Sequence, residues 1–235
     1  MPRPIAVFRH YPTEGPAYLG DFLSEESYPW QLVALDEGRP VPSAADGFAG
    51  LVFMGGPMSV NDDLPWIPPV LRLIRDAVAR GVPVLGHCLG SQLMSKALGG
   101  QVTQNPLKEI GWGAVRVRNT PEARRWFGAG ETFEAFHWHG ETWSLPPGAE
   151  LLAGSEACSH QAFALGPHLG MQFHVEMTEA YVRSWCEGGR REIESSRSPA
   201  VQSMATILEQ MPHKLPAMTD RARHIYRVWM EGLAR

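Results

Sequence analysis

The first hundred residues alternate between short apolar runs and longer amphipathic stretches, the pattern typical of an α/β protein. The runs predicted as strands span residues 5–8, 31–35, 50–54 and 82–86. The fourth run is apolar throughout, as expected for a strand buried on both faces of a parallel sheet. Apolar residues at helical spacing predict helices over 66–80 and 89–98, each followed by glycine.

The rest of the chain predicts shorter strands and then a helical end. Strands are expected over 115–118, 133–138, 151–153, 162–165 and 169–173. Helices are expected over 178–187, 200–210 and 219–233, with a polar loop over 188–199. We therefore predict a flavodoxin-like α/β fold, a three-layer sandwich whose mostly parallel central sheet carries antiparallel strands at one edge. Residues 1–190 are expected to form the domain, and residues 191–235 its C-terminal helical extension.

Composition and charge narrow the function classes. The 235 residues carry a formal net charge of −4 and include three cysteines. A nucleic-acid binder normally shows a basic excess, so we expect no nucleic-acid partner. The sequence has no apolar run of the roughly 20 residues that a membrane helix needs. Its cysteines are few and odd in number, so they do not suggest a disulfide framework. We therefore expect a cytoplasmic protein without membrane contact.

The strongest chemical signal is the segment Gly86–Gln92, where the fourth predicted strand turns directly into a helix. Such a turn exposes the Cys88 side chain above the sheet edge, and the helix N-terminus favours a thiolate and supplies free N–H groups for an oxyanion. Gly86 and Gly90 leave room for this turn. Cys88 is therefore a candidate nucleophile; the alternative is a buried structural cysteine beside a glycine turn.

A cysteine nucleophile needs a base, and the base needs an orienting partner. His174 and Glu176 lie two residues apart at the end of an apolar strand. Residues i and i+2 of an extended chain face the same side, so a carboxylate there can bond one imidazole nitrogen while the other faces the thiol. The alternative is an accidental polar pair at a strand end.

These residues together resemble the class I glutamine amidotransferases. The nucleophile turn of that family reads Gly-x-Cys-x-Gly-x-Gln, its base pair reads His-x-Glu, and a Gly-Gly-Pro turn follows its third strand. The matching positions here are 86–92, 174–176 and 55–57. The resemblance runs from about residue 5 to residue 176. It looks closest to a stand-alone branch that is similar to the glutaminase domain of GMP synthetase and includes γ-glutamyl peptidases.

The resemblance implies a role for each matched catalytic position. Cys88 would attack the side-chain amide of glutamine and form a γ-glutamyl thioester. His174 would take the thiol proton and give it to the leaving ammonia, and Glu176 would orient His174. The backbone N–H groups of Gly56 and Leu89 would hold the oxyanion. No cofactor is implied.

The resemblance also implies substrate contacts. Gln92 would lie near the substrate amide, and the segment around His139 and Glu141 would recognise the α-amino and α-carboxylate groups. Glu141 stands where the family usually has a shorter aspartate. A metal site is not predicted, because the His-x-His and Cys-x-His spacings at residues 137–139 and 158–160 lack the paired spacing of structural zinc sites.

Three functions remain open at this point. The first is a glutaminase that releases ammonia from glutamine, and the second is a γ-glutamyl peptidase with the same thioester chemistry. The third is a catalytically silent domain that binds a partner, against which the complete Cys88, His174 and Glu176 set argues. Because about 55 to 60 residues follow Glu176, we expect any ammonia acceptor to be a separate synthetase partner. The C-terminal helices are expected to cap the domain or to form a homodimer.

Overall fold

Nine strands form one sheet in the computed structural model, which describes residues 3–233. The spatial order is β2-β1-β3-β4-β9-β8-β7-β5-β6. The strands are β1 (Ile5–Arg9), β2 (Trp30–Ala34), β3 (Gly50–Phe53), β4 (Val84–His87), β5 (Val102–Val117), β6 (Thr132–Trp143), β7 (Glu150–Gly154), β8 (Ala162–Leu165) and β9 (His168–Met171). The helices are α1 (Tyr18–Glu25), α2 (Ile67–Ala79), α3 (Leu89–Ala97), α4 (Pro121–Phe127), α5 (Glu179–Gly188), α6 (Arg190–Ser195) and α7 (Met204–Met230).

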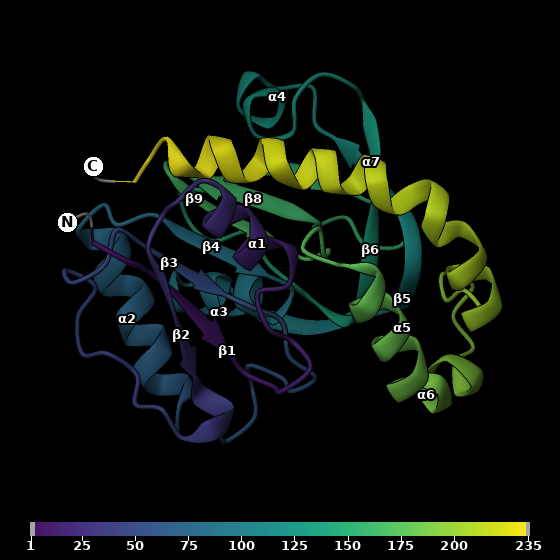
Figure 1. Cartoon of the computed structure of the whole chain (residues 1–235), viewed down its shortest axis with the longest axis horizontal. Helices are drawn as coiled ribbons and strands as arrows, with labels where there is room; N and C mark the ends of the chain where they lie inside the picture. The colour runs from purple at the N-terminus through teal and green to yellow at the C-terminus, as the bar shows by residue number, and fades with distance from the viewer. Residues whose placement is uncertain (1–2, 234–235) are drawn as a thin grey trace.

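The sheet has a parallel half and an antiparallel half. Strands β2, β1, β3, β4 and β9 pair in parallel, whereas β8, β7, β5 and β6 continue the sheet with antiparallel pairs. Helices cover the parallel half on both sides, which makes three layers (Figure 1). The predicted flavodoxin-like class, with antiparallel strands added at one edge, is confirmed.

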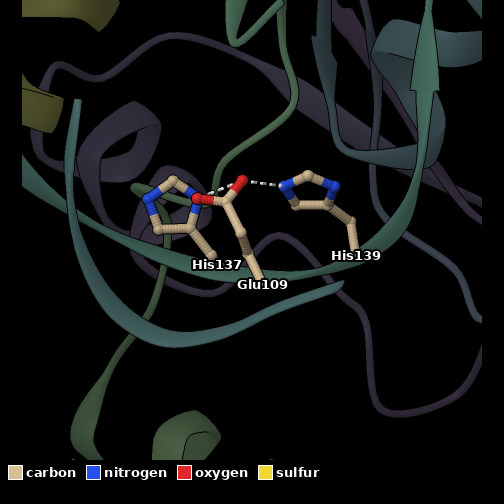
Figure 2. Close-up of side chains that lie close together, drawn as sticks. All are labelled: Glu109, His137 and His139. Atoms are coloured by element: carbon tan, nitrogen blue, oxygen red, sulfur yellow. Dashed lines mark hydrogen bonds and ion pairs between the residues drawn. The ribbon is translucent and has the colours of Figure 1, made fainter. Parts of the chain in front are cut away.

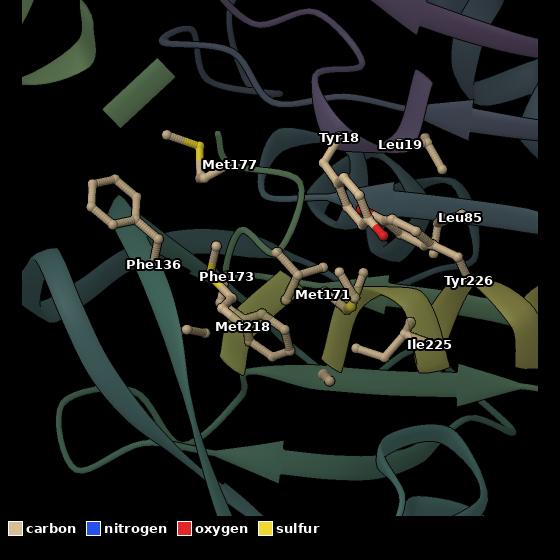
Figure 3. Packing of buried hydrophobic residues seen from close by; sticks show 14 of the residues in the cluster. Tyr18, Leu19, Leu85, Phe136, Met171, Phe173, Met177, Met218, Ile225 and Tyr226 are labelled. Atoms are coloured by element: carbon tan, nitrogen blue, oxygen red, sulfur yellow. The ribbon is translucent and has the colours of Figure 1, made fainter. Parts of the chain in front are cut away.

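Successive side chains of the buried strands point to opposite faces of the sheet, which divides the core into two layers. Ile5 and Val7 of β1 pack on the side of α1 and α7, while Ala6 and Phe8 pack on the side of α2 and α3. Successive strand residues point to opposite faces, so one apolar run supplies both layers. Figure 3 shows the first layer, in which Tyr226 of α7 packs among residues of α1, β4 and β9.

The long β5–β6 ribbon was only partly predicted. The sequence indicated strand over 115–118, but β5 runs from Val102 to Val117. Its first half contains Pro106, and its register against β6 shifts between Gln104 and Glu109. Gly111, in the middle of the strand, has a φ of 109°, a value that side chains rarely adopt. A bulged strand of this kind shows no regular alternation, so its pairing with β6 is visible only in the structure.

The two C-terminal helices predicted from the sequence are a single helix. Helix α7 has 27 residues and contains Pro212 and Pro216, both exposed. A proline inside a helix costs about 3 kcal/mol, which is why the sequence indicated a break. Helix α7 continues through them because it buries a long apolar stripe against the core. The predicted loop over 188–199 is also wrong in part, since it contains α6.

None of the helices within residues 3–233 combines the length and the apolar character needed to cross a bilayer.

The packing of α7 into the core predicts how the C-terminal segment unfolds. Ile225 is fully buried in the layer shared with β4 and β9. Ile225→Ala should lower the free energy of unfolding by about 2 to 5 kcal/mol in one cooperative transition, as measured by urea denaturation. The exposed His213→Ala change on the same helix should cost less than about 0.5 kcal/mol. A separate early transition confined to α7 would contradict the expectation.

Candidate active site

The turn between β4 and α3 holds Cys88 in a strained backbone conformation. Its φ and ψ angles are 47° and −106°, a region that residues other than glycine rarely occupy. A Cβ atom on Gly86 would lie 2.6 Å from the carbonyl carbon of Gly90. A Cβ atom on Gly90 would in turn collide with the carbonyl oxygen of Phe53 in β3. The two glycines therefore let β3, β4 and α3 approach closely at the nucleophile turn, as the sequence predicted.

The Cys88 thiol faces a cavity of about 580 Å³ at the carboxyl ends of the parallel strands. The Cys88 N–H donates to the carbonyl oxygen of Met171 at 2.7 Å, which ties the turn to β9. The Gln172 side-chain nitrogen lies 3.5 Å from Sγ, and the Trp138 carbonyl oxygen lies 3.8 Å from it. The residues that line the cavity include Glu14, Gly56, Cys88, Gln92, Glu141 and His174.

His174 and Glu176 form a buried pair beside this thiol. Nδ1 of His174 lies 2.6 Å from Oε1 of Glu176, and Oε2 accepts from the Val175 N–H at 2.9 Å. Burial alone would lower the pKa of His174, but the Glu176 carboxylate and the hydrogen-bonding Cys88 sulfur raise it well above its usual value. Burial opposes ionisation of Glu176, yet the His174 charge holds its pKa at about 2. The geometry thus favours an imidazolium next to the sulfur.

A second histidine lies behind this pair, on the face of β4 away from the cavity. Nε2 of His87 is 3.2 Å from the Tyr226 hydroxyl of α7 and 3.7 Å from Oε2 of Glu176. Burial lowers the pKa of His87, so the ring is neutral. His87, which precedes Cys88, thus faces the core on the side of α7.

The two predicted oxyanion residues lie next to each other, and Gly56 lines the cavity. A Cβ atom on Gly56 would come within 2.6 Å of a methyl carbon of Leu89. Leu89 is the first residue of α3, where a backbone N–H has no acceptor within its own helix. The loop after β3 and the first turn of α3, distant in sequence, therefore meet beside Cys88.

The three residues predicted to contact the substrate differ in their hydrogen-bond partners and in their burial. Gln92 lies at the cavity wall with its side-chain nitrogen 3.3 Å from Oε1 of Gln172. Glu141 also lines the cavity, and its Oε1 accepts from the Ser59 hydroxyl at 2.9 Å. The His139 ring is almost wholly buried, with Nδ1 3.0 Å from the Glu141 carbonyl oxygen and Nε2 2.9 Å from Glu109. His139 also lines the cavity, but both of its ring nitrogens already have partners, one of which is the Glu141 backbone.

Two residues close to Cys88 and His174 were not predicted from the sequence: the fully buried Gln172 and the cavity residue Glu14. Gln172 contacts both the thiol and Gln92, and only its place before His174 hinted at it. The carboxyl of Glu14 packs against Gly55 near the His174 ring. Burial raises the pKa of Glu14 to about 7. Its place in the loop after β1, at the carboxyl end of a parallel strand, was the available signal.

Comparison with known protein families identifies the family of this chain. The family model described as glutamine amidotransferase class-I matches residues 23–181. The chain belongs to the class I glutamine amidotransferase family. A relative within it, the glutamine amidotransferase-like protein YfeJ of Salmonella typhimurium, is 32% identical over 195 residues, covering 78% of this chain and 82% of YfeJ.

Other class I relatives include longer enzymes and solved structures. A glutamine-hydrolysing GMP synthase of Aromatoleum aromaticum is 32% identical over 140 residues, which is 55% of this chain but 26% of that protein. A glutamine amidotransferase structure from Methylobacillus flagellatus is 43% identical with a TM-score of 0.98, covering 100% of this chain and 97% of the other. One from Thermotoga maritima is 25% identical with a TM-score of 0.85, covering 96% and 97%.

The strain at Cys88 predicts that two small replacements differ in stability. Glycine adopts a φ of 47° without penalty, whereas alanine keeps the clash of its Cβ atom. We expect Cys88→Gly to be more stable than Cys88→Ala by roughly 1 to 3 kcal/mol in denaturant unfolding. Equal stabilities, or a less stable glycine variant, would show that the turn is relaxed.

Glu14 predicts a pH-dependent loss of stability. Its pKa of about 7 in the folded protein lies above its ordinary value of 4.5, so the folded state keeps the proton to higher pH than the unfolded state. The contribution of Glu14 to the free energy of unfolding therefore falls as the pH rises from about 4.5 to 7, and it stays reduced above that range. Glu14→Gln should be more stable than wild type at pH 8 by at least about 1 kcal/mol and should lose this advantage at pH 4.5. Glu131→Gln, at an exposed position, is the matched control and should show no such trend.

Proposed function

We propose that this class I glutamine amidotransferase is an active cysteine amidase that cleaves the γ-glutamyl amide of glutamine. The observation that carries the proposal is the meeting of Cys88 with the buried His174–Glu176 pair in one cavity. A thiol held at a helix N-terminus beside an imidazolium has the surroundings of a reactive thiolate. A purely structural cysteine needs neither a charged pair nor a strained turn.

The reaction follows from these positions. The Cys88 thiolate attacks the amide carbon, and the developing oxyanion is held by the N–H groups of Gly56 and Leu89. His174 donates its proton to the amide nitrogen, the C–N bond breaks, and ammonia leaves a γ-glutamyl thioester on Cys88. His174 then takes a proton from water, which attacks the thioester. The C–S bond breaks to release glutamate and restore the thiolate and the imidazolium.

The polar groups of the cavity suit an amino-acid substrate. Glu141, fixed by His139 and by the Ser59 hydroxyl, offers a carboxylate for the substrate ammonium. Gln92 lies near the thiol on the side where the amide would sit. For the nitrogen released, we propose a separate synthetase as acceptor, because the matched GMP synthases are glutamine-hydrolysing and extend far beyond the matched region. The proposal also includes a cytoplasmic location and C-terminal helices that either cap the domain or form a homodimer.

The size of the cavity supports a second candidate, a γ-glutamyl peptidase. A volume of about 580 Å³ lies in the range of drug-sized ligand sites, larger than free glutamine requires. Its wall includes the aromatic side chains of Tyr11, Trp138 and Trp185, from three separate segments of the chain. These rings offer apolar contact to the part of a γ-glutamyl compound beyond the scissile bond. The thioester chemistry is the same, but the leaving group is a larger amine.

The deciding experiment compares ammonia release from glutamine with cleavage of γ-glutamyl peptides, including glutathione. Cys88→Ala should lower kcat by at least about 1000-fold on every accepted substrate, as expected when a nucleophile is removed. Cys158→Ala is the matched control and should retain activity. The Cys158 thiol is buried, is hydrogen-bonded to the Thr142 hydroxyl and does not line the cavity.

Each result has a distinct meaning. A diazoketone analogue of glutamine should label Cys88, as detected by mass spectrometry. A kcat/KM for the peptides far above that for glutamine selects the peptidase. Full activity of Cys88→Ala, or labelling only at Cys158 or Cys186, contradicts both candidates.

A further inference from the structure

A buried cluster of metal-ligand type lies beside the catalytic cavity and takes no part in the proposed reaction. Glu109 of β5 lies opposite His139 of β6 in the strand register, and His137 is two residues from His139 on the same strand. The three side chains project to one side of the ribbon, with Glu109 between the two imidazoles (Figure 2). One ligand atom from each lies within 4.8 Å of the others, and all three residues are more than nine-tenths buried.

In each of the two imidazoles, one nitrogen faces Glu109 and the other faces a backbone carbonyl oxygen. Nδ1 of His139 lies 3.0 Å from the Glu141 oxygen, and Nε2 of His137 lies 3.4 Å from the Gly113 oxygen. A carbonyl oxygen only accepts, so these two nitrogens carry the protons. The remaining nitrogens, Nε2 of His139 and Nδ1 of His137, point at Glu109. Metal-binding histidines are oriented by outer hydrogen bonds of this kind.

Two unsatisfied atoms mark the same place. Nδ1 of His137 is buried without a hydrogen-bond partner in the described part of the chain, and it is 4.0 Å from Oε2 of Glu109. The Gln161 side-chain oxygen is also buried and unpaired there. A buried polar atom without a partner costs roughly 1 to 3 kcal/mol, so an arrangement that leaves a histidine nitrogen free needs an explanation.

The carboxylate is held as a ligand would be. Oε1 of Glu109 accepts from the Ser155 hydroxyl at 2.8 Å, and Oε2 accepts from the Gln161 amide at 2.7 Å. Glu109 and His137 also line a second cavity of about 440 Å³, which gives a small ion a route to the cluster. Two imidazoles, one carboxylate, a surrounding set of hydrogen bonds and an entry path are the features expected of a divalent transition-metal site.

We propose that Glu109, His137 and His139 form a binding site for a divalent transition-metal cation of the zinc type. Nε2 of His139 lies 2.9 Å from Oε2 of Glu109, a distance that requires a proton between the two atoms in addition to the one on Nδ1. On binding, the cation displaces this proton to the solvent and uses the free Nδ1 of His137. Ligand atoms around tetrahedral zinc lie about 3.3 Å apart, so a small movement of the His137 ring completes the geometry. The site cross-links β5 and β6 next to Glu141, and it goes beyond the proposed amidase function, on which it does not depend.

The test uses the full chain with Cys88→Ser, because a reactive thiol beside His174 also attracts zinc. Titration with Zn²⁺ should show about one equivalent bound and a rise in Tm. With Co²⁺, the visible bands of a low-symmetry site should appear without a sulfur-to-cobalt charge-transfer band. Two exchangeable imidazole N–H protons, from His137 and His139, should be shifted by the paramagnetic ion in the NMR spectrum.

Variants assign the ligands. Glu109→Gln and His137→Asn, each in the Cys88→Ser chain, should weaken Zn²⁺ binding at least about 10-fold. His213→Asn removes an exposed histidine and should leave binding unchanged. Absence of binding to the Cys88→Ser chain overturns the proposal, as does unchanged affinity in both cluster variants or a cobalt–sulfur band. If a variant does not fold, the two shifted N–H signals still decide whether two histidines are ligands. Since every readout is metal binding, loss of amidase activity has no bearing on the outcome.

Discussion

The close approach of β3, β4 and α3 at Gly86 and Gly90 is the constraint on which the rest of the site depends. It forces the chain into the strained conformation seen at Cys88, and the hydrogen bond from Cys88 to β9 holds it there. A strained residue persists only where its surroundings over-determine it. Here the surroundings are two buried strands and a helix, so the rigidity of the sheet fixes the position of the Cys88 thiol.

The same strand, β4, connects the site to the C-terminal helix. His87, one residue before the nucleophile, contacts Tyr226 of α7 and approaches Glu176 from behind. Glu176 thus has a charged imidazole on the cavity side and a neutral one on the core side. A buried carboxylate is tolerated only when it is paired and hydrogen-bonded, and these contacts supply that requirement. Helix α7 therefore shapes the environment of the His174–Glu176 pair, although none of its residues lines the cavity.

The antiparallel half of the sheet also contributes to the cavity wall. The β5–β6 ribbon carries Glu141 into the cavity, and helices α5 and α6 lie beside the ribbon (Figure 1). Its edge-to-face ring contact between Trp138 and Trp185, with centroids 6.0 Å apart, joins ribbon and helix at the cavity wall. Behind Glu141, the buried Glu109–His139 contact fixes the ribbon at the register position where the two strands face each other.

The sequence by itself determined the elements whose patterns are local: the buried parallel strands, helices α2 and α3, and the choice of Cys88, His174 and Glu176 as candidate site residues. A strand-to-helix turn between glycines and a histidine two residues from a carboxylate both follow from spacing along the chain. Only the tertiary structure decided that Glu14 and Gln172 face the catalytic groups and that the His139 ring turns inward to Glu109. It also decided that α7 runs unbroken through two prolines. These outcomes depend on strand register and on burial between segments far apart in sequence, because packing across the core outweighs local preference.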